Sequence, residues 1–215
     1  MIAWKPKPFI FVHIPKCAGT SMEAALIPLA TGYAKIEDMP WEKRDGHWLP
    51  GKHEKQHLKL REFAREYPLR EYFKFSIVRN PWDRALSQIE FLRQGRTSAH
   101  IFCGQNLKEN LKIYCNSTLK PGNQDLGACQ LDYLLDDSGE CGMDFVGRFE
   151  SLPSDFRRIC AGIGAERPPD FPHLKNARRP QHYSAYYDAE SAEWVRRRFA
   201  RDIEYFGYTF ETPVA

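Results

Sequence analysis

The sequence contains no hydrophobic run long enough to cross a bilayer, and its first apolar run is the short segment Phe9–Val12. A membrane-spanning helix needs about 20 consecutive apolar residues. The segment Met1–Pro8 also lacks the apolar stretch of a secretory signal peptide. The chain as given is therefore expected to be cytoplasmic, with no membrane segment.

An excess of charge of either sign is also missing. The 215 residues include 31 Lys and Arg against 28 Asp and Glu, which gives a formal net charge of +3. This balance excludes a generally basic protein that coats nucleic acid, so no nucleic-acid partner is expected, but it leaves room for a local basic pocket. Hydrophobic residues make up 42% and aromatic residues 13%, which excludes disorder as the main state. The length is compatible with one domain over 1–215.

Cysteines are few, and none of them forms a CxxC pair. The six lie at positions 17, 103, 115, 129, 141 and 160. Without paired cysteines a zinc site is not expected, and the sequence has no Asp-rich cluster that would bind another metal. Because nothing indicates secretion, free thiols are expected, with a bridge inside the irregular region 103–141 as the alternative.

The sequence also lacks internal repeats and low-complexity tracts, and its apolar pattern alternates between strand and helix. Strands are predicted at 9–14, 72–78 and 144–149, and helices at 22–30, 53–67, 82–94, 124–135, 151–162 and 188–205. The stretches 31–52, 95–123 and 165–183 are predicted to be loops or weakly ordered. Strands that alternate with helices predict an α/β fold with a parallel sheet, whose ligands lie at the carboxyl ends of the strands.

The segment after the first strand is typical of an anion site. A buried strand, a short loop with Gly19, and a helix start with Thr20 and Ser21 bring backbone N–H groups toward one point. Lys16 adds a mobile positive charge. The loop is not a Walker A motif, because its lysine precedes its glycine, and this disfavours magnesium-dependent ATP hydrolysis. The alternative is a plain strand–turn–helix that binds no ligand.

A second candidate anion site follows the second predicted strand. Arg79 stands where that strand ends, and Ser87 lies about two helical turns later. An arginine fork and a hydroxyl can converge on one phosphate. The alternative is a structural corner in which Arg79 pairs with a carboxylate. Because both segments follow parallel strands, residues 15–21 and 79–81 are expected on the same rim of the sheet.

These motifs resemble the two cofactor motifs of sulfotransferases, most closely the carbohydrate sulfotransferase-like family 2, which includes heparan and chondroitin sulfotransferases. The resemblance covers nearly the whole chain outside about 95–143, and the segments that carry it are His13–Ser21, Phe75–Ser87, Val146–Glu150, Tyr183–Asp188 and Phe206–Tyr208. It implies a P-loop-NTPase-like parallel sheet flanked by helices, the sulfotransferase fold. It also implies the donor 3′-phosphoadenosine-5′-phosphosulfate, with 3′,5′-adenosine bisphosphate as the product.

The resemblance assigns roles to named positions. Arg79 and Ser87 would hold the 3′-phosphate of the donor. A basic segment at 175–179, with Arg178 and Arg179, would close over the cofactor phosphates, although a solvated face is the alternative there. The 5′-phosphosulfate would bind the first loop, at Lys16, Cys17, Ala18, Gly19, Thr20 and Ser21.

Two catalytic residues are expected. Lys16 would stabilise the charge that grows on the leaving phosphate. His53 would be the general base, since family members place a catalytic histidine in this segment and the pKa of histidine suits the task. His57, one helical turn later, is the second choice, and Glu54 is a carboxylate alternative. Both histidines could instead be ordinary surface residues.

The acceptor is expected to be a hydroxyl on a carbohydrate. Residues 31–52 and an insertion at 95–143 would shape its site, where Trp41, Trp48, Phe102 and Tyr114 could stack on sugar rings. Two other functions stay open: an atypical P-loop kinase acting on a small molecule, and a non-catalytic nucleotide-binding module.

Overall fold

The computed structural model describes residues 2–5, 7–29, 31–34, 57–65, 67–93, 106–116, 127–166, 171 and 179–211. The chain divides into two compact units, each built from two segments. The first unit combines Met1–Val78 with Asp132–Lys175, and the second combines Arg79–Leu131 with Asn176–Ala215.

The first unit is built on a five-stranded sheet in the order β3-β1-β2-β4-β5. Its strands are β1 (Ile2–Lys5), β2 (Phe9–Val12), β3 (Thr31–Ala34), β4 (Phe73–Val78) and β5 (Phe145–Arg148). The strands β2, β4 and β5 run parallel, and β1 pairs antiparallel with both β2 and β3. The predicted α/β fold with a parallel sheet is therefore confirmed, and the carboxyl ends of β2, β4 and β5 lie at one edge.

The antiparallel strands β1 and β3 are not anticipated by the sequence. No strand is predicted before Phe9, and 31–52 is predicted as a loop, whereas Thr31–Ala34 forms β3. Each of these two strands is only four residues long. Their pairing with neighbouring strands decides their conformation, and single-sequence patterns do not report that pairing.

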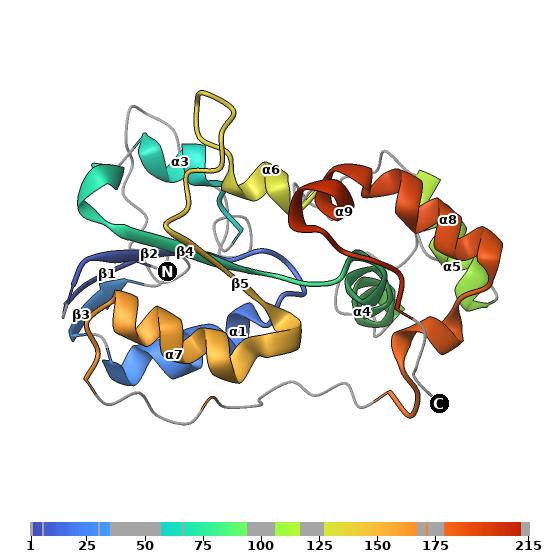
Figure 1. Cartoon of the computed structure of the whole chain (residues 1–215), viewed down its shortest axis with the longest axis horizontal. Coiled ribbons are helices and arrows are strands. Elements are labelled where there is room, and N and C mark those ends of the chain that lie inside the picture. The colour runs from blue at the N-terminus through green and yellow to red at the C-terminus, as the bar shows by residue number, and fades with distance from the viewer. Residues whose placement is uncertain are drawn as a thin grey trace. The chain divides into compact units, whose positions relative to one another are not determined.

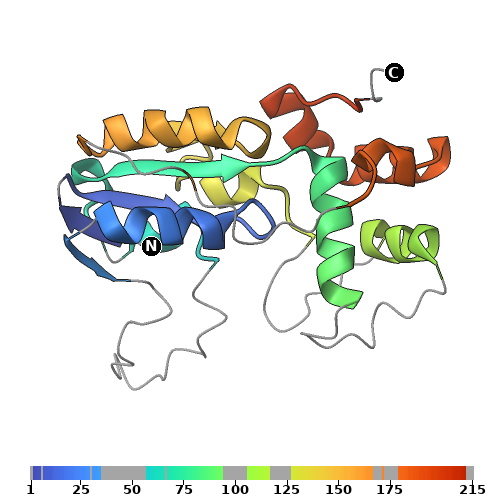
Figure 2. The same ribbon diagram turned by 90° about the horizontal axis from the view of Figure 1, so that it is seen from below.

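Helices cover both faces of this sheet. Figure 1 shows α1 (Gly19–Leu26) and α7 (Leu152–Gly162) on one face and α3 (Leu60–Ala64) on the other, and Figure 2 looks onto the side of α1 and α7. The predicted helix 151–162 is confirmed. The predicted helix 53–67 is confirmed only as the short α3, and residues 53–56 lie outside the described residues.

The core of the first unit begins on β2 and β4, where Phe9, Phe11 and Phe75 are almost fully buried. The ring of Phe75 lies 5.4 Å from that of Phe11 and 5.7 Å from that of Phe9. The hydroxyl of buried Ser76 donates a hydrogen bond of 2.7 Å to the carbonyl of Val12, which joins β4 to β2 at their carboxyl ends.

The second unit is helical and packs around α4 (Pro81–Arg93), which confirms the predicted helix 82–94. Its other helices are α5 (Leu107–Asn116), α8 (Ala189–Arg198) and α9 (Ala200–Phe206), and α5 lies beside α8 (Figure 1). The apolar stripe of α4 meets residues of α5 and α8 in one cluster, which contains Trp82, Leu86, Ile89, Leu111, Tyr114, Val195 and Phe199.

Two helical predictions need correction, and one helix lies where none is predicted. The weakly periodic stretch 95–123 contains α5, whose buried Leu111 and Tyr114 are surrounded by polar residues that obscure the pattern. The predicted helix 188–205 is two helices, because Phe199 leaves the helical conformation at φ −113° and ψ 29° while its side chain stays in the core. The predicted helix 124–135 is reduced to α6 (Leu131–Leu134), with 117–126 outside the described residues.

Five cysteines of the described chain are free thiols: Cys17, Cys115, Cys129, Cys141 and Cys160. Cys103 lies outside the described residues. Burial raises the pKa of Cys115 to about 12 and that of Cys160 to about 11, so both thiols stay protonated at neutral pH. Within the described part of the chain, no helix is long and apolar enough to span a bilayer.

Candidate functional site

The loop between β2 and α1 is strained. Lys16 has φ 66° and Ala18 has φ 60°, and these are the non-glycine residues with a left-handed backbone among those described. Such a conformation costs roughly 1–2 kcal/mol for a residue with a Cβ atom. Strained backbone persists where the surrounding structure enforces it and is concentrated at functional sites. The loop predicted to bind an anion therefore has a fixed and unusual shape.

The N-terminus of α1 follows this loop without a side-chain cap. Ala18 is the N-cap residue, it accepts the first helical hydrogen bond from Met22 N–H at 2.9 Å, and no acidic residue stands in the first turn. The first N–H groups of a helix have no partner inside the helix, and the helix dipole adds partial positive charge there. The N–H groups of Gly19, Thr20 and Ser21 belong to this turn, and an anion is the ligand that suits them.

Gly19 is required at its position by a close approach of His13. A Cβ atom on Gly19 would lie 1.8 Å from Nε2 of the His13 ring. Real Cβ atoms do not approach other atoms so closely, so any larger residue would displace the ring or the first turn of α1. The conformation of the loop thus depends on the side chain of His13 beneath it.

His13 belongs to a buried polar cluster with Glu23 and His57. Nδ1 of His13 lies 3.4 Å from Oε1 of Glu23, and both side chains are less than one-tenth exposed. The rings of His13 and His57 meet edge to face, with centroids 4.7 Å apart. Glu23 is a residue that the sequence pattern did not single out, because nothing in the sequence pairs it with His13.

The ring of His57 is oriented by the backbone of this cluster. Its Nδ1 lies 2.9 Å from the carbonyl oxygen of His13. Because a carbonyl oxygen only accepts hydrogen bonds, Nδ1 of His57 is the nitrogen that carries the proton. In the neutral ring the basic lone pair is then on Nε2, which is the arrangement that a general base needs.

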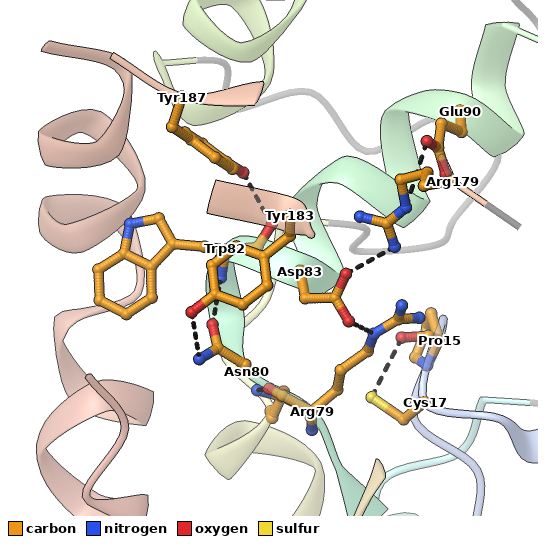
Figure 3. A network of polar contacts seen from close by, with 11 residues as sticks. Pro15, Cys17, Arg79, Asn80, Trp82, Asp83, Glu90, Arg179, Tyr183 and Tyr187 are labelled. Carbon is orange, nitrogen blue, oxygen red and sulfur yellow. Dashed lines mark hydrogen bonds and ion pairs between the residues drawn. The ribbon is translucent and has the colours of Figure 1, made fainter. Parts of the chain in front are cut away.

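Cys17 stabilises the loop from within. Its buried Sγ donates to the carbonyl oxygen of Pro15 at 3.6 Å, as Figure 3 shows, and its N–H donates to the carbonyl of Ile14 at 3.4 Å. Both groups of Cys17 therefore serve the turn in which Lys16 is held.

In the second unit, Arg79 is held by its side chain and by its backbone. Its Nε donates to Oδ2 of Asp83 at 2.7 Å. Its N–H donates to Oε1 of Gln130 at 2.8 Å, and its carbonyl accepts from Nε2 of Gln130 at 2.9 Å. Arg79 therefore does pair with a carboxylate, and this pairing also fixes the direction of its guanidinium group. Its role as a phosphate ligand stays a prediction.

A buried carboxylate anchors Gln130 in turn. Asp202 of α9 accepts from the N–H groups of Gln130 at 2.8 Å and Leu131 at 3.0 Å. Burial raises the pKa of Asp202, while the charge of Arg84 acts against that rise. Arg84 is 2% exposed and donates to the carbonyl oxygen of Ala128. This network positions Arg79, and none of its members beyond Arg79 has a sequence signal.

Asp83 also contacts Arg179, another arginine that the sequence predicts to bind a cofactor phosphate. Nη2 of Arg179 lies 2.6 Å from Oδ1 of Asp83, and Nε of Arg179 lies 3.4 Å from Oε1 of Glu90. Figure 3 shows the two oxygens of Asp83 directed toward Arg79 and Arg179. The structure thus brings together two of the arginines predicted to bind cofactor phosphate, through a carboxylate.

Ser87 lies on the same face of α4 as these carboxylates. It follows Asp83 by four residues and precedes Glu90 by three, which is the spacing of neighbours along one helix face. Arg179 reaches both carboxylates and so passes along this face. Ser87 therefore shares a face of α4 with the two carboxylates that Arg179 contacts.

Aromatic hydroxyls stabilise the corner at Asn80. The amide of Asn80 donates to the hydroxyl of Tyr183 at 3.1 Å, and the hydroxyl of Tyr187 donates to the carbonyl of Trp82 at 2.7 Å (Figure 3). Burial raises the pKa of both tyrosines, so both hydroxyls stay protonated at neutral pH.

Several predicted positions fall outside the described residues. These are the predicted base His53, its alternative Glu54, the basic residues Lys175 and Arg178, and the aromatic residues Trp41, Trp48 and Phe102. Tyr114 is described and is 3% exposed in the core of the second unit, so it is a packing residue and does not stack on a sugar. The expectation that residues 15–21 and 79–81 share one rim stays a prediction.

A family model described as "Sulfotransferase family" matches residues 2–209 of the chain. No curated protein matches the chain significantly.

Proposed function

Because the chain belongs to the sulfotransferase family, we propose that it transfers the sulfuryl group of 3′-phosphoadenosine-5′-phosphosulfate to a hydroxyl of a carbohydrate. The observation that carries the proposal is the strained loop of Lys16 and Ala18, which leads into an uncapped helix N-terminus. The two units would act together as one sulfotransferase domain.

The first loop is proposed to hold the 5′-phosphosulfate. Its ligands would be Lys16 and the N–H groups at the start of α1, together with the hydroxyls of Thr20 and Ser21. A sulfuryl group and its bridging phosphate are anionic oxygen groups, which suit N–H donors and a lysine. The small residues Ala18 and Gly19 would let the backbone approach them closely.

The second site is proposed to hold the 3′-phosphate. Arg79, Ser87 and Arg179 supply two guanidinium groups and a hydroxyl beside one face of α4. Guanidinium groups match the geometry of phosphate oxygens. Arg178, next to Arg179 in the chain, would add a further positive charge.

The reaction is proposed to be an in-line displacement at sulfur. The acceptor hydroxyl loses its proton to a histidine, its oxygen forms a bond to sulfur, and the bond from sulfur to the 5′-phosphate oxygen breaks. The electron pair of that bond stays on the phosphate of the released 3′,5′-adenosine bisphosphate. Lys16 would stabilise this growing charge.

The base is proposed to be His53, with His57 as the second candidate. A specific observation favours His57: the carbonyl of His13 holds its ring at 2.9 Å, with Nε2 as the basic nitrogen. Replacing each histidine with alanine and measuring turnover at saturating acceptor separates the two, since the variant that lacks the base loses turnover and the other retains it. If both variants keep full turnover, neither histidine is the base.

The test of the function is sulfate transfer from labelled donor to a panel of carbohydrate acceptors, read as a gain in mass of about 80 Da for an added SO₃ group. Lys16→Ala is expected to lower turnover about 100-fold, because one stabilising donor at a developing charge contributes on that order. Lys112→Ala, an exposed lysine of α5, is the matched control and keeps its turnover.

Two outcomes would contradict the proposal. Binding of magnesium-ATP that is tighter than binding of 3′,5′-adenosine bisphosphate would favour the kinase alternative. Tight binding of the bisphosphate with no transfer to any acceptor would favour a non-catalytic nucleotide-binding module.

A further inference from the structure

A single carboxylate joins the two arginines of the second site. Asp83 accepts from Nε of Arg79 with one oxygen and lies 2.6 Å from Nη2 of Arg179 with the other. All three side chains are mostly buried, with 8% of Arg79, 15% of Asp83 and 13% of Arg179 exposed. Two guanidinium groups so close together would repel each other strongly without a shared anion, since solvent screening is weak at this burial.

The bonds to Asp83 use only part of each guanidinium group. Arg79 binds Asp83 through Nε, at the base of its fork, whereas Arg179 binds Asp83 through Nη2 and contacts Glu90 through Nε. The remaining nitrogen of Arg179, Nη1, is buried and has no hydrogen-bond partner among the described residues. A buried donor without a partner is costly, so this atom is directed to a place where a ligand would stabilise it.

The ligand that fits this place is a phosphate monoester. Two guanidinium groups held by the same carboxylate supply the positive charge, and Ser87 stands on the helix face that also carries Asp83 and Glu90. A dianionic terminal phosphate offers three acceptor oxygens to such donors. A ribose hydroxyl is neutral and has a single oxygen, so it would give the two guanidinium groups no additional charge-assisted hydrogen bond. The arrangement should thus favour a nucleotide that carries a phosphate over one that carries a hydroxyl.

We propose that Asp83 is a positioning residue that orients Arg79 and Arg179 as one unit and thereby makes the site select a 3′-phosphate over a 3′-hydroxyl. This inference rests on the proposed function, because that function identifies the nucleotide. Asp83 does not touch the phosphate in this scheme. It acts only through the two arginines.

Our proposal predicts that removing the charge of Asp83 weakens phosphate selection, whereas a model based on net charge alone predicts stronger phosphate binding. Asp83 is an anion next to a proposed anion site, so removing its charge should tighten phosphate binding if charge alone mattered. Glu90 supplies a matched control. It stands on the same helix face and contacts Arg179 at 3.4 Å, and no ion pair joins it to Arg79 among the described contacts. Neutralising Glu90 changes the charge by the same amount and leaves the pair of Arg79 with Asp83 intact.

The experiment measures calorimetric affinities for 3′,5′-adenosine bisphosphate and 5′-adenosine monophosphate, which differ only in the 3′-phosphate. Asp83→Asn is expected to lower the preference for the bisphosphate about tenfold, because charge-assisted hydrogen bonds to both arginines are lost. Glu90→Gln is expected to keep or raise that preference. An Asp83→Asn variant with an unchanged or increased preference would overturn the proposal.

A second variant covers the case in which Asp83→Asn does not fold. Arg179→Lys keeps the positive charge but has no fork that can bind Asp83 and a phosphate at the same time, so its preference should fall severalfold. An Arg179→Lys protein with the full preference would overturn the proposal as well. If the unaltered protein shows no preference for the bisphosphate, the proposed function fails instead.

Discussion

Lys16 and Ala18 carry backbone strain within the folded chain itself. Packing beneath the loop stabilises these left-handed conformations, since Cys17 is only 1% exposed and His13 only 5% exposed. An anion that binds the loop therefore does not have to order it. The shape of the loop should be sensitive to changes in the layer below, even where those changes touch no ligand.

Gly19→Ala is the substitution that should disturb the packing around His13 most directly. The new Cβ would lie 1.8 Å from Nε2 of His13, so the ring or the helix start must move. We expect the free energy of unfolding to fall by about 2 kcal/mol, as for overpacked cores, and binding of 3′,5′-adenosine bisphosphate to weaken. Urea denaturation and calorimetry measure the two effects.

Gly164→Ala is the control for this variant. Gly164 has φ +74° and no atom would lie within 4 Å of its Cβ, so only backbone strain is added, about 1 kcal/mol. Bisphosphate binding should be unchanged. A Gly19→Ala protein that binds and unfolds like the Gly164→Ala protein would show that the contact with His13 is easily relieved.

Among the elements, those with their own buried pattern could be predicted from sequence. The continuous apolar run of β4 and the apolar stripe of α4 each report burial directly. The short β1 and β3 and the break at Phe199 depend on neighbours that are distant in the chain. The same division applies to the site, since the residues of the first loop and Arg79 stand in local motifs. Gln130 meets Arg79 across 51 residues, and a local pattern cannot show that.

The start of α8 illustrates a local signal in detail. Asp188 is its N-cap and accepts from Ser191 N–H at 2.8 Å, and its other oxygen lies 2.7 Å from Nζ of Lys108 on α5. The hydrogen bond from Lys108 is the largest cause that lowers the pKa of Asp188, followed by the hydrogen bonds from Ser191. One side chain therefore both begins α8 and ties it to α5.

Replacements of Asp188 separate these two roles. Asp188→Asn keeps an oxygen for the cap but loses the ion pair, whereas Asp188→Ala loses both. Because the folded pKa of Asp188 is lowered, its charge stabilises the protein above the unfolded pKa, and this stabilisation is lost as pH falls. At neutral pH the midpoint of thermal unfolding should be highest for the unaltered protein, lower for Asp188→Asn and lowest for Asp188→Ala. At about pH 2 the gap between the unaltered protein and Asp188→Asn should narrow. An Ala variant as stable as the Asn variant would mean that the cap contributes nothing.

At the scale of the whole molecule, the chain passes between the two units after Val78, Leu131 and Lys175, so neither unit is a continuous stretch. The second unit is joined across this discontinuity by Asp202 of the last helix, which binds Gln130 and Leu131 from across 72 and 71 residues. Gln130 holds the backbone of Arg79. The proposed phosphate site thus depends on residues from both segments of its unit.

Asp202→Ala should therefore have two consequences. Loss of the buried acceptor leaves N–H groups of Gln130 and Leu131 without a partner, which should lower the free energy of unfolding by about 3 kcal/mol. Binding of 3′,5′-adenosine bisphosphate should weaken as well, because Arg79 loses the support of its backbone. Denaturant unfolding and calorimetry are the measurements, with Asp137→Ala, an exposed carboxylate, as the control. Unchanged nucleotide affinity in a destabilised Asp202→Ala protein would show that this hydrogen-bond network stabilises the fold but does not support the phosphate site.

The interleaving of the two units has a consequence for how the protein is made. The helix α4 leaves the ribosome early, but two residues that pack in the same core cluster, Val195 of α8 and Phe199 between α8 and α9, follow only after β5 has been synthesised. Until then a nascent chain exposes Trp82, Leu86 and Ile89 to other chains, which is the situation in which growing polypeptides aggregate. Slow synthesis near the end of the chain, or a shortage of chaperones, should therefore reduce the yield of this protein more than its final stability would suggest.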